Sequence, residues 1–164
     1  MARLDLPDGD APEIVRVWEL RPDMGAAVRD LSIAVYQDSR LPPRVRESAR
    51  MRIALINGCE VCRGWRIPEL AEQGVDEELY AHVEQWRDHP GYSDAERLAI
   101  EYGERYALDH KNIDDAFFAR LKQEFTDAEI LDLTICIGNW VAFGRLTMLL
   151  DLDEACETRI RETV

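Results

Sequence analysis

Apolar residues in this 164-residue chain recur mainly at the three-to-four-residue spacing of amphipathic helices. A first clear helix is predicted over residues 23–38, with a shorter turn before it at residues 13–20. A second helix follows Pro42-Pro43, because proline suits a first helical turn, and ends before Gly58. No segment shows convincing period-two alternation, so the pattern predicts essentially no sheet.

The next segment is expected to form a third helix that begins near Cys59 and ends before Gly74. Pro68 should bend or break this helix, because proline lacks the backbone N–H and its ring clashes with the preceding turn. Asp76 is expected to cap a fourth helix that runs to about residue 88.

Two capping boxes organise the second half of the chain. The first, Ser93–Glu96, opens a fifth helix to about residue 109, and a sixth helix follows at residues 114–124. The second box, Thr126–Glu129, opens a long seventh helix. This helix is apolar nearly all round, so it should form the core of the domain or of a subunit interface.

These elements predict an all-α fold, a helical bundle of about seven helices. Apolar residues make up 46% of the chain, which is enough to bury a core without help from a metal or disulfides. We therefore expect residues 1–164 to form a single domain, with a core at about 12–152 and a charged C-terminal tail at 153–164.

The net charge narrows the range of partners. The chain carries 33 acidic and 20 basic side chains, for a formal charge of −13. Nucleic acids and anionic membrane surfaces attract basic proteins, so neither is an expected partner. The N-terminal residues do not resemble a secretory signal, and Asp132, Asn139 and Arg145 make the most apolar helix a poor membrane span. The expected location is the cytoplasm.

The sharpest chemical signal is a CxxC motif formed by Cys59 and Cys62. Cysteines at i and i+3 lie on the same side of a helical turn, where the N-terminal amides would lower a thiol pKa. Arg63 and Arg66 add positive charge nearby. One thiolate could attack a peroxide to give a sulfenic acid, and the other thiol could resolve it to a disulfide.

A lone CxxC motif is also compatible with two inert thiols or with half of a zinc site. Zinc needs two more ligands, and the chain has neither a His-x-x-x-His pair nor a second CxxC, although subunits could share a site.

Glu47 is a further candidate, because it lies twelve residues before Cys59 on the helix that leads into the motif. Its carboxylate could take a proton from a thiol through water. On periodicity alone, a solvated surface glutamate is the simpler interpretation.

The remaining candidates have simpler structural interpretations. We expect His82 on a surface, His89 in a turn and His110 at a helix end. Cys136 should be a small core residue. We also expect Trp140 and Phe143 in the core, at positions that could line a pocket beside the cysteines.

Several motifs together resemble the carboxymuconolactone decarboxylase family, in particular its alkyl hydroperoxide reductase D-like (AhpD-like) branch. That branch has a glutamate twelve residues before a CxxC, and a histidine four residues after the second cysteine. The resemblance covers roughly residues 12–152. It rests on the segments Leu41–Glu47, Ala54–Cys62 with Gly74, Ser93–Arg97, Phe125–Ile130 and Ile137–Trp140 with Arg145.

The resemblance implies an all-helical fold that assembles as a trimer, hexamer or larger ring, with the CxxC near a subunit interface. It implies hydroperoxide reduction through a dithiol/disulfide couple, with Cys62 as the attacking thiol and Cys59 as the resolving one. Glu47 would be the acid/base of a proton relay. The place of the family histidine is held by Arg66. Arginine stays protonated and would act as an electrostatic stabiliser of the thiolate.

The sequence is therefore interpreted as a homo-oligomeric thiol-dependent oxidoreductase, an alkylhydroperoxidase-like enzyme that needs no cofactor and no metal. Its expected partners are a hydroperoxide substrate and a thiol or disulfide reductant. A catalytically degenerate helical scaffold is the alternative. A decarboxylase acting on an aromatic-degradation lactone fits less well, because that branch of the family does not rely on a CxxC.

Overall fold

The structure is a computed structural model, and it describes residues 2–152. These residues form an all-α fold with no strand among them. The α-helices are α1 (Glu13–Arg16), α2 (Pro22–Ile33), α3 (Pro43–Asn57), α4 (Glu60–Gly64), α5 (Glu77–Ala81), α6 (Asp94–Asp109), α7 (Asp115–Glu124) and α8 (Asp127–Leu150). Short 3-10 turns are η1 (Val17–Leu20), η3 (Pro68–Gln73), η4 (Val83–Gln85) and η5 (His110–Asn112), and η2 (Ala34–Asp38) is a π-helical turn.

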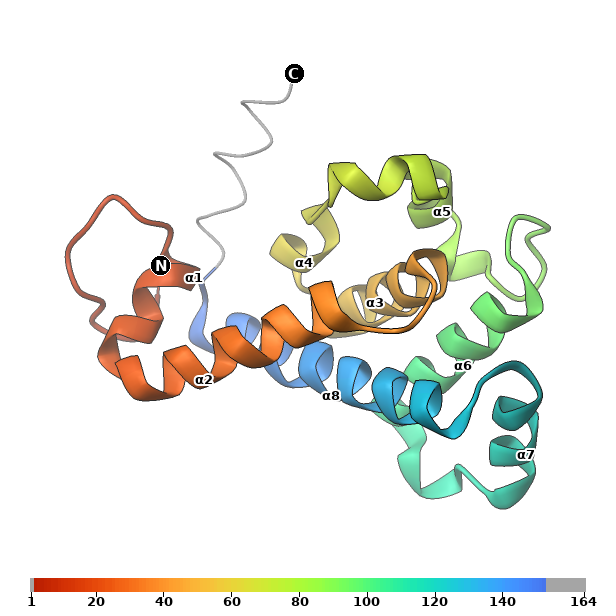
Figure 1. Cartoon of the computed structure of the whole chain (residues 1–164). Helices are drawn as coiled ribbons and strands as arrows, with labels where there is room; N and C mark the ends of the chain where they lie inside the picture. The colour runs from red at the N-terminus through yellow and green to blue at the C-terminus, as the bar shows by residue number, and fades with distance from the viewer. Residues whose placement is uncertain (1, 153–164) are drawn as a thin grey trace.

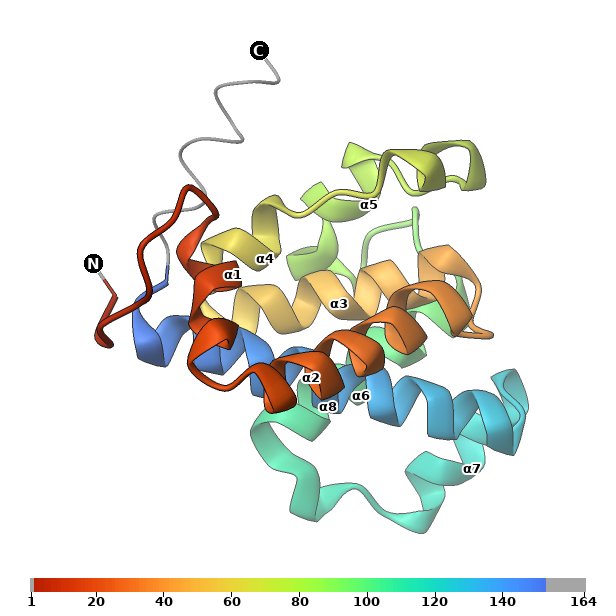
Figure 2. The ribbon, with the colours of Figure 1, turned by 60° about the vertical axis from the view of Figure 1, so that its left-hand side comes forward.

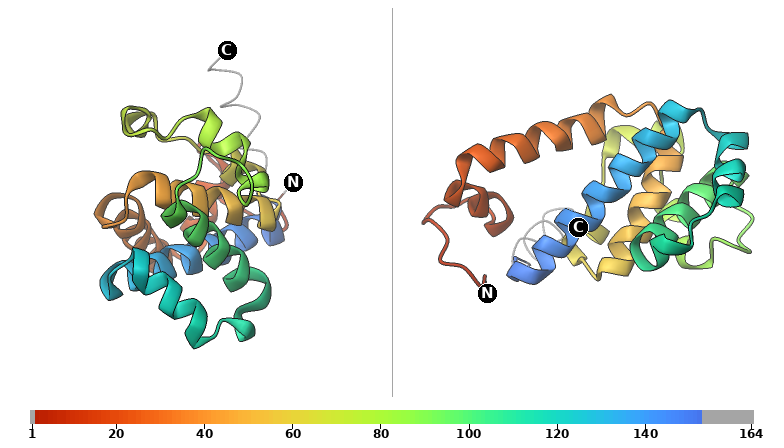
Figure 3. Two further views of the ribbon diagram at one scale, coloured as in Figure 1. Left: turned by 90° about the vertical axis from the view of Figure 1, so that its right-hand side faces the viewer. Right: turned by 90° about the horizontal axis from the view of Figure 1, so that it is seen from below.

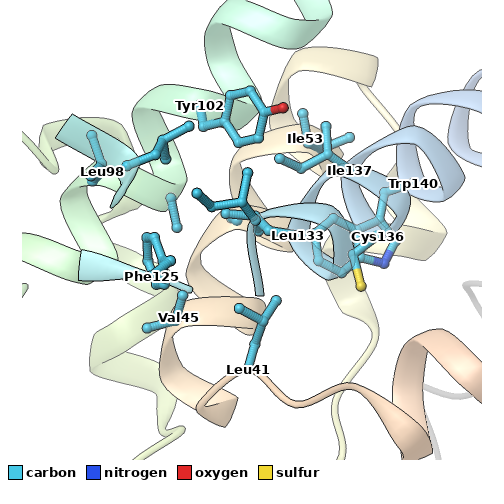
Figure 4. Packing of buried hydrophobic residues seen from close by; sticks show 14 of the residues in the cluster. Leu41, Val45, Ile53, Leu98, Tyr102, Phe125, Leu133, Cys136, Ile137 and Trp140 are labelled. Carbon is cyan, nitrogen blue, oxygen red and sulfur yellow. The ribbon is translucent and has the colours of Figure 1, made fainter. Parts of the chain in front are cut away.

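Helix α3 is the centre of the fold. It packs against α6 and α8 on one side and lies beneath α4 and α5 on the other (Figures 1 and 2). Leu133 of α8 lies in the middle of the larger apolar cluster, among Val45, Tyr102 and Ile137 (Figure 4). A second cluster, on the α5 side of α3, consists of Met51, Ala54, Val75, Leu79, Tyr80, Val83, Trp86, Tyr92 and Ile100. Burial of these two clusters fixes the position of α3.

Helix α8 is the long apolar helix that the sequence predicts. By length and composition it could cross a membrane, but it packs along α3, and Leu133 and Ile137 are fully buried there. Cys136 is also buried, as expected for a core cysteine. One side of α8 thus belongs to the core, whereas Leu131, Ile135 and Leu149 on the same helix are exposed.

Helix α2 runs along the outer edge of the molecule (Figure 3). None of its residues is fully buried, and it contacts mainly the adjoining turns η1 and η2. Trp18 of η1 meets Phe143 of α8 edge-on, with ring centroids 6.0 Å apart, and this contact attaches the N-terminal part to the core.

The structure confirms the predicted order of elements but shortens two of them. The expected third helix is divided into α4 and η3. The backbone is already extended at Trp65, which follows α4, and is extended again at Ile67, where proline imposes this conformation on the residue before it. The expected fourth helix ends at Ala81 rather than near residue 88, and continues as the turn η4. The single-domain interpretation stays a prediction, and the tail at 153–164 lies outside the described residues.

Gly58 sets the direction in which the chain leaves α3. Its φ is +67°, and the N–H groups of Gly58 and Cys59 donate to the carbonyls of Leu55 and Ala54. This pattern is a Schellman cap, which satisfies the last carbonyls of a helix and needs a left-handed residue. The cap turns the chain directly into the CxxC motif.

We predict that Gly58→Ala lowers the free energy of unfolding by about 1–2 kcal/mol, the cost of a left-handed conformation for an ordinary residue. A Cβ at this position would meet no atom within 4 Å, so the loss is conformational and not steric. Urea denaturation measures it, with Gly58→Asn as the control, because asparagine tolerates this conformation and should lose less. Equal losses for the two variants would contradict a conformational cause.

Candidate redox site

The two motif cysteines form a disulfide at the start of α4, with their Cα atoms 5.2 Å apart. Cys59 is the N-cap of α4, and its Sγ accepts a hydrogen bond from the backbone N–H of Cys62 at 3.2 Å. The Cys59 side chain is fully buried, whereas Cys62 is partly exposed. The two sulfur atoms therefore have different access to small molecules.

An apolar cavity of about 240 Å³ adjoins Cys62. Helix α8 contributes Trp140 and Phe143 to its wall, the two aromatic residues expected near the cysteines, and Tyr36 comes from η2. The other lining residues are Ile14, Ser32, Arg50, Ala54, Val61, Trp65, Asn139, Gly144 and Thr147. Because most of these side chains are apolar or aromatic, the cavity suits an organic molecule better than an ion.

A buried carboxylate lies on α3 behind the motif. Glu47 is 0% exposed, so it is not the solvated surface residue that periodicity alone favoured. Its Oε2 accepts from Arg50 Nε at 2.7 Å and from the Tyr80 hydroxyl at 3.1 Å. Its Oε1 accepts no hydrogen bond from any residue that the structure describes, and lies 3.6 Å from Arg46 Nε. Burying this charge requires the two arginines around it.

Arg50 joins the carboxylate to the CxxC turn. Its Nη1 donates to the carbonyl of Cys62 at 2.6 Å and its Nη2 to that of Trp65 at 3.2 Å, while its Nε is bonded to Glu47. One guanidinium thus fixes the second half of α4 and its C-cap to the carboxylate on α3. Burial by itself would lower the pKa of Arg50, but the Glu47 carboxylate raises it above its ordinary value.

Two tyrosines complete the surroundings. Burial, followed by the charge of Glu47, raises the pKa of Tyr80 to about 12. Burial likewise raises the pKa of Tyr36. Both hydroxyls therefore keep their protons at neutral pH, and Tyr80 acts as a hydrogen-bond donor to Glu47.

Arg66 lies on the outer side of this site. Its guanidinium pairs with Glu77, with Nε 2.6 Å from Oε1, and lies 4.1 Å from the centre of the Tyr80 ring. It also donates to the carbonyls of Arg63 and Trp65. Its predicted role as a thiolate stabiliser stays a prediction.

The structure thus joins Cys59 to Cys62 and links Glu47 to the Cys62 backbone through Arg50, and it adds two residues that the sequence pattern did not single out. Arg50 stands three residues after Glu47, a spacing typical of a helical ion pair, so its pairing could have been found from the sequence. Tyr80 lies 33 residues beyond Glu47, and only the tertiary fold shows that they meet. Within residues 2–152, no group of three metal-ligating side chains includes either motif cysteine, so the half-zinc-site interpretation gains no support.

Comparisons with known proteins agree with this architecture. The model of the carboxymuconolactone decarboxylase family matches residues 22–105. The uncharacterized protein YnjA of Escherichia coli K12 is 33% identical over 124 residues, which cover 76% of this chain and 68% of YnjA.

Solved structures show the same fold. ATU0492 of Agrobacterium tumefaciens, a protein of unknown function described as a putative antioxidant defence protein AhpD, has a TM-score of 0.74 and 24% identity, covering 92% of this chain and 96% of its own. A peroxidase-related protein with an alkylhydroperoxidase AhpD core from Ralstonia eutropha JMP134 has a TM-score of 0.76 and 16% identity, covering 92% and 90%.

We predict that Arg50→Met destabilises the fold by about 3–5 kcal/mol, because it leaves the Glu47 carboxylate buried without its main partner. Adding Glu47→Gln to this variant should restore part of the loss, since no carboxylate then needs compensation. Urea denaturation of the two single variants and the double variant measures the coupling. Additive losses would show that the pair does not stabilise the site in the way described.

Proposed function

We propose that this chain, which belongs to the carboxymuconolactone decarboxylase family and has an AhpD-like fold, is a thiol-dependent oxidoreductase that reduces organic hydroperoxides. The observation that carries this proposal is the placement of the Cys59–Cys62 pair. Cys62 lines the apolar cavity, whereas its disulfide partner Cys59 is fully buried beside it. A substrate in the cavity would meet one sulfur and leave the other as the internal partner.

The proposed reaction has two steps. The Cys62 thiolate attacks the terminal oxygen of the hydroperoxide and breaks the O–O bond, which gives a Cys62 sulfenic acid and, after protonation, an alcohol. The Cys59 thiol then attacks the sulfenic sulfur, which forms the disulfide and releases water. Two thiols and one hydroperoxide thus become one disulfide, one alcohol and one water. A small dithiol or a thiol protein returns the disulfide to two thiols.

The charged residues of α3 support the proton movements of this reaction. Before the first step, the Cys62 thiol must lose a proton, and the alkoxide that leaves must gain one. Glu47 is a buried carboxylate with one oxygen that accepts no hydrogen bond within residues 2–152, and Arg50 links it directly to the Cys62 backbone. We assign the acid/base role to Glu47, acting through water, and the stabilisation of the thiolate to Arg50 together with Arg66.

The other expectations continue as proposals. We propose that the chain works as a homo-oligomer in the cytoplasm with a thiol or disulfide reductant. Large apolar side chains exposed on α2 and α8 agree with association between copies: Met24, Leu31 and Ile33 on α2, and Leu131, Ile135 and Leu149 on α8.

We predict that the reduced protein loses two of its four thiols rapidly when it is mixed with an organic hydroperoxide, in a stopped-flow experiment with thiol counting. Cys62→Ser should abolish the rapid phase. Cys59→Ser should let Cys62 react but stop at a sulfenic acid, which a dimedone adduct detects by mass spectrometry. Cys136→Ser is the matched control, because that buried cysteine lies outside the site. The rate of the rapid thiol loss should be the same in this variant as in the parent protein.

Thiol loss no faster than that of free cysteine would overturn the peroxidase proposal. Disulfide exchange or a non-catalytic scaffold would then be the better account of the CxxC motif.

The cavity predicts a preference for bulky apolar hydroperoxides. Phe143→Ala removes apolar wall area, so we expect the rate constant for cumene hydroperoxide to fall about tenfold, while that for hydrogen peroxide changes less than about twofold. Leu149→Ala is the control, because Leu149 is on the same helix but is exposed and lies outside the cavity. An equal fall for both peroxides would show that the cavity does not hold the carbon skeleton.

A further inference from the structure

A cluster of metal-ligating side chains lies on α5, on its C-cap residue His82 and on the loop that follows η4. Glu78 and His82 are one helical turn apart, and His89 comes from the loop before Pro90. One ligand atom from each of the three side chains lies within 4.8 Å of the other two. The two imidazole rings stack at a centroid distance of 4.1 Å and an interplanar angle of 12°. The sequence placed these histidines on a surface and in a turn, and did not bring them together.

From this constellation we infer a site for a divalent metal ion of the zinc type, held by Glu78, His82 and His89. Two imidazole nitrogens and one carboxylate are a ligand set that suits Zn²⁺, whereas Mg²⁺ and Ca²⁺ prefer oxygen ligands alone. Three protein ligands leave a fourth tetrahedral position for water. Glu78 is exposed and both histidines are half-buried, so an ion can reach the site from solvent.

The loop that carries His89 is held in place independently of any ion. Arg97 Nη2 donates to the His89 carbonyl at 2.6 Å, and Arg44 Nη2 donates to the Gly91 carbonyl at 2.9 Å. A Cβ at Gly91 would lie 3.0 Å from His89 Nδ1, so only glycine at this position leaves space for the His89 imidazole. A backbone fixed in this way lowers the entropy cost of gathering the ligands.

Only side chains need to move to close the site. Nitrogen and oxygen ligands at about 2.0–2.1 Å from a tetrahedral zinc ion are about 3.4 Å apart. The ligand atoms lie within 4.8 Å of one another, so rotations of the two imidazoles and the flexible Glu78 side chain suffice. Coordination ends the ring stacking and breaks the hydrogen bond that the Gly91 N–H donates to His89 Nδ1 at 3.2 Å, which is a small loss beside the metal bonds gained.

An ion at this site would attach α5 to the loop at residues 88–92. Helix α5 has only five residues, too few to be stable by itself, and it also carries Tyr80 to Glu47 and Glu77 to Arg66. Metal binding by Glu78 and His82 would therefore also restrain Tyr80 and Glu77, which contact Glu47 and Arg66 of the redox site. The proposed thiol chemistry does not depend on this ion.

The test is isothermal titration calorimetry of the full chain with ZnCl₂. It uses the variant Cys59→Ser/Cys62→Ser, so that the motif thiols cannot supply ligands. We expect one Zn²⁺ per chain, a rise in melting temperature on binding, and no response to MgCl₂. In that background His82→Ala, His89→Ala and Glu78→Gln should each weaken Zn²⁺ binding at least about tenfold. His110→Ala is the matched control, and should bind as tightly as the parent.

No Zn²⁺ binding in the parent, or binding that survives both His82→Ala and His89→Ala, would overturn the site. Circular dichroism of each variant shows whether it is folded, and Glu78→Gln keeps the test decisive because an exposed glutamine cannot disturb the core. Hydroperoxide reduction plays no part in these measurements, so their outcome is independent of the proposed function.

Discussion

The buried ion pair between Glu47 and Arg50 is the interaction on which the site depends. Both side chains lie on α3, at the centre of the fold, and both are almost completely shielded from solvent. A buried carboxylate is tolerated only when it is compensated, so the pair must be kept intact. Arg50 also donates to the carbonyls of Cys62 and Trp65. The same guanidinium therefore compensates the buried charge of Glu47 and holds the CxxC turn in position.

The packing of the other helices around α3 keeps this ion pair and the CxxC turn in place. Helices α6 and α8 bury one side of α3, and the cluster around α5 buries the other. Gly58 then ends α3 with a left-handed residue and turns the chain so that Cys59 is enclosed while Cys62 lies beside the apolar cavity. The helix cap at Gly58 thus leads to the difference in exposure between Cys59 and Cys62. This difference is the reason why we assign the attacking role to Cys62 and the resolving role to Cys59.

The sequence predicts the local features of the fold well and the tertiary contacts poorly. The capping boxes at Ser93 and Thr126, and the apolar periodicity between them and along the chain, predict the main helices. Pro68 predicts the break after α4, but periodicity does not show how early the helix after Asp76 ends. The spacing of twelve residues from Glu47 to Cys59 indicates a functional glutamate only by resemblance to the family. Periodicity alone does not predict that Glu47 is buried, because its burial depends on partners elsewhere in the chain. The contact of Tyr80 with Glu47, like the pairing of His82 with His89, joins segments whose proximity no local pattern records.

The unequal environments of the two cysteines are central to the proposed chemistry, and alkylation of the reduced native protein tests them most directly. Iodoacetamide is added over a range of pH, and mass spectrometry identifies which cysteine is modified first. We predict that Cys62 reacts first and that Cys59 reacts much more slowly, because Cys62 lines the cavity and Cys59 is fully buried. Reaction of Cys59 first, or of both thiols at the rate of free cysteine, would contradict the proposed division between an attacking and a resolving thiol.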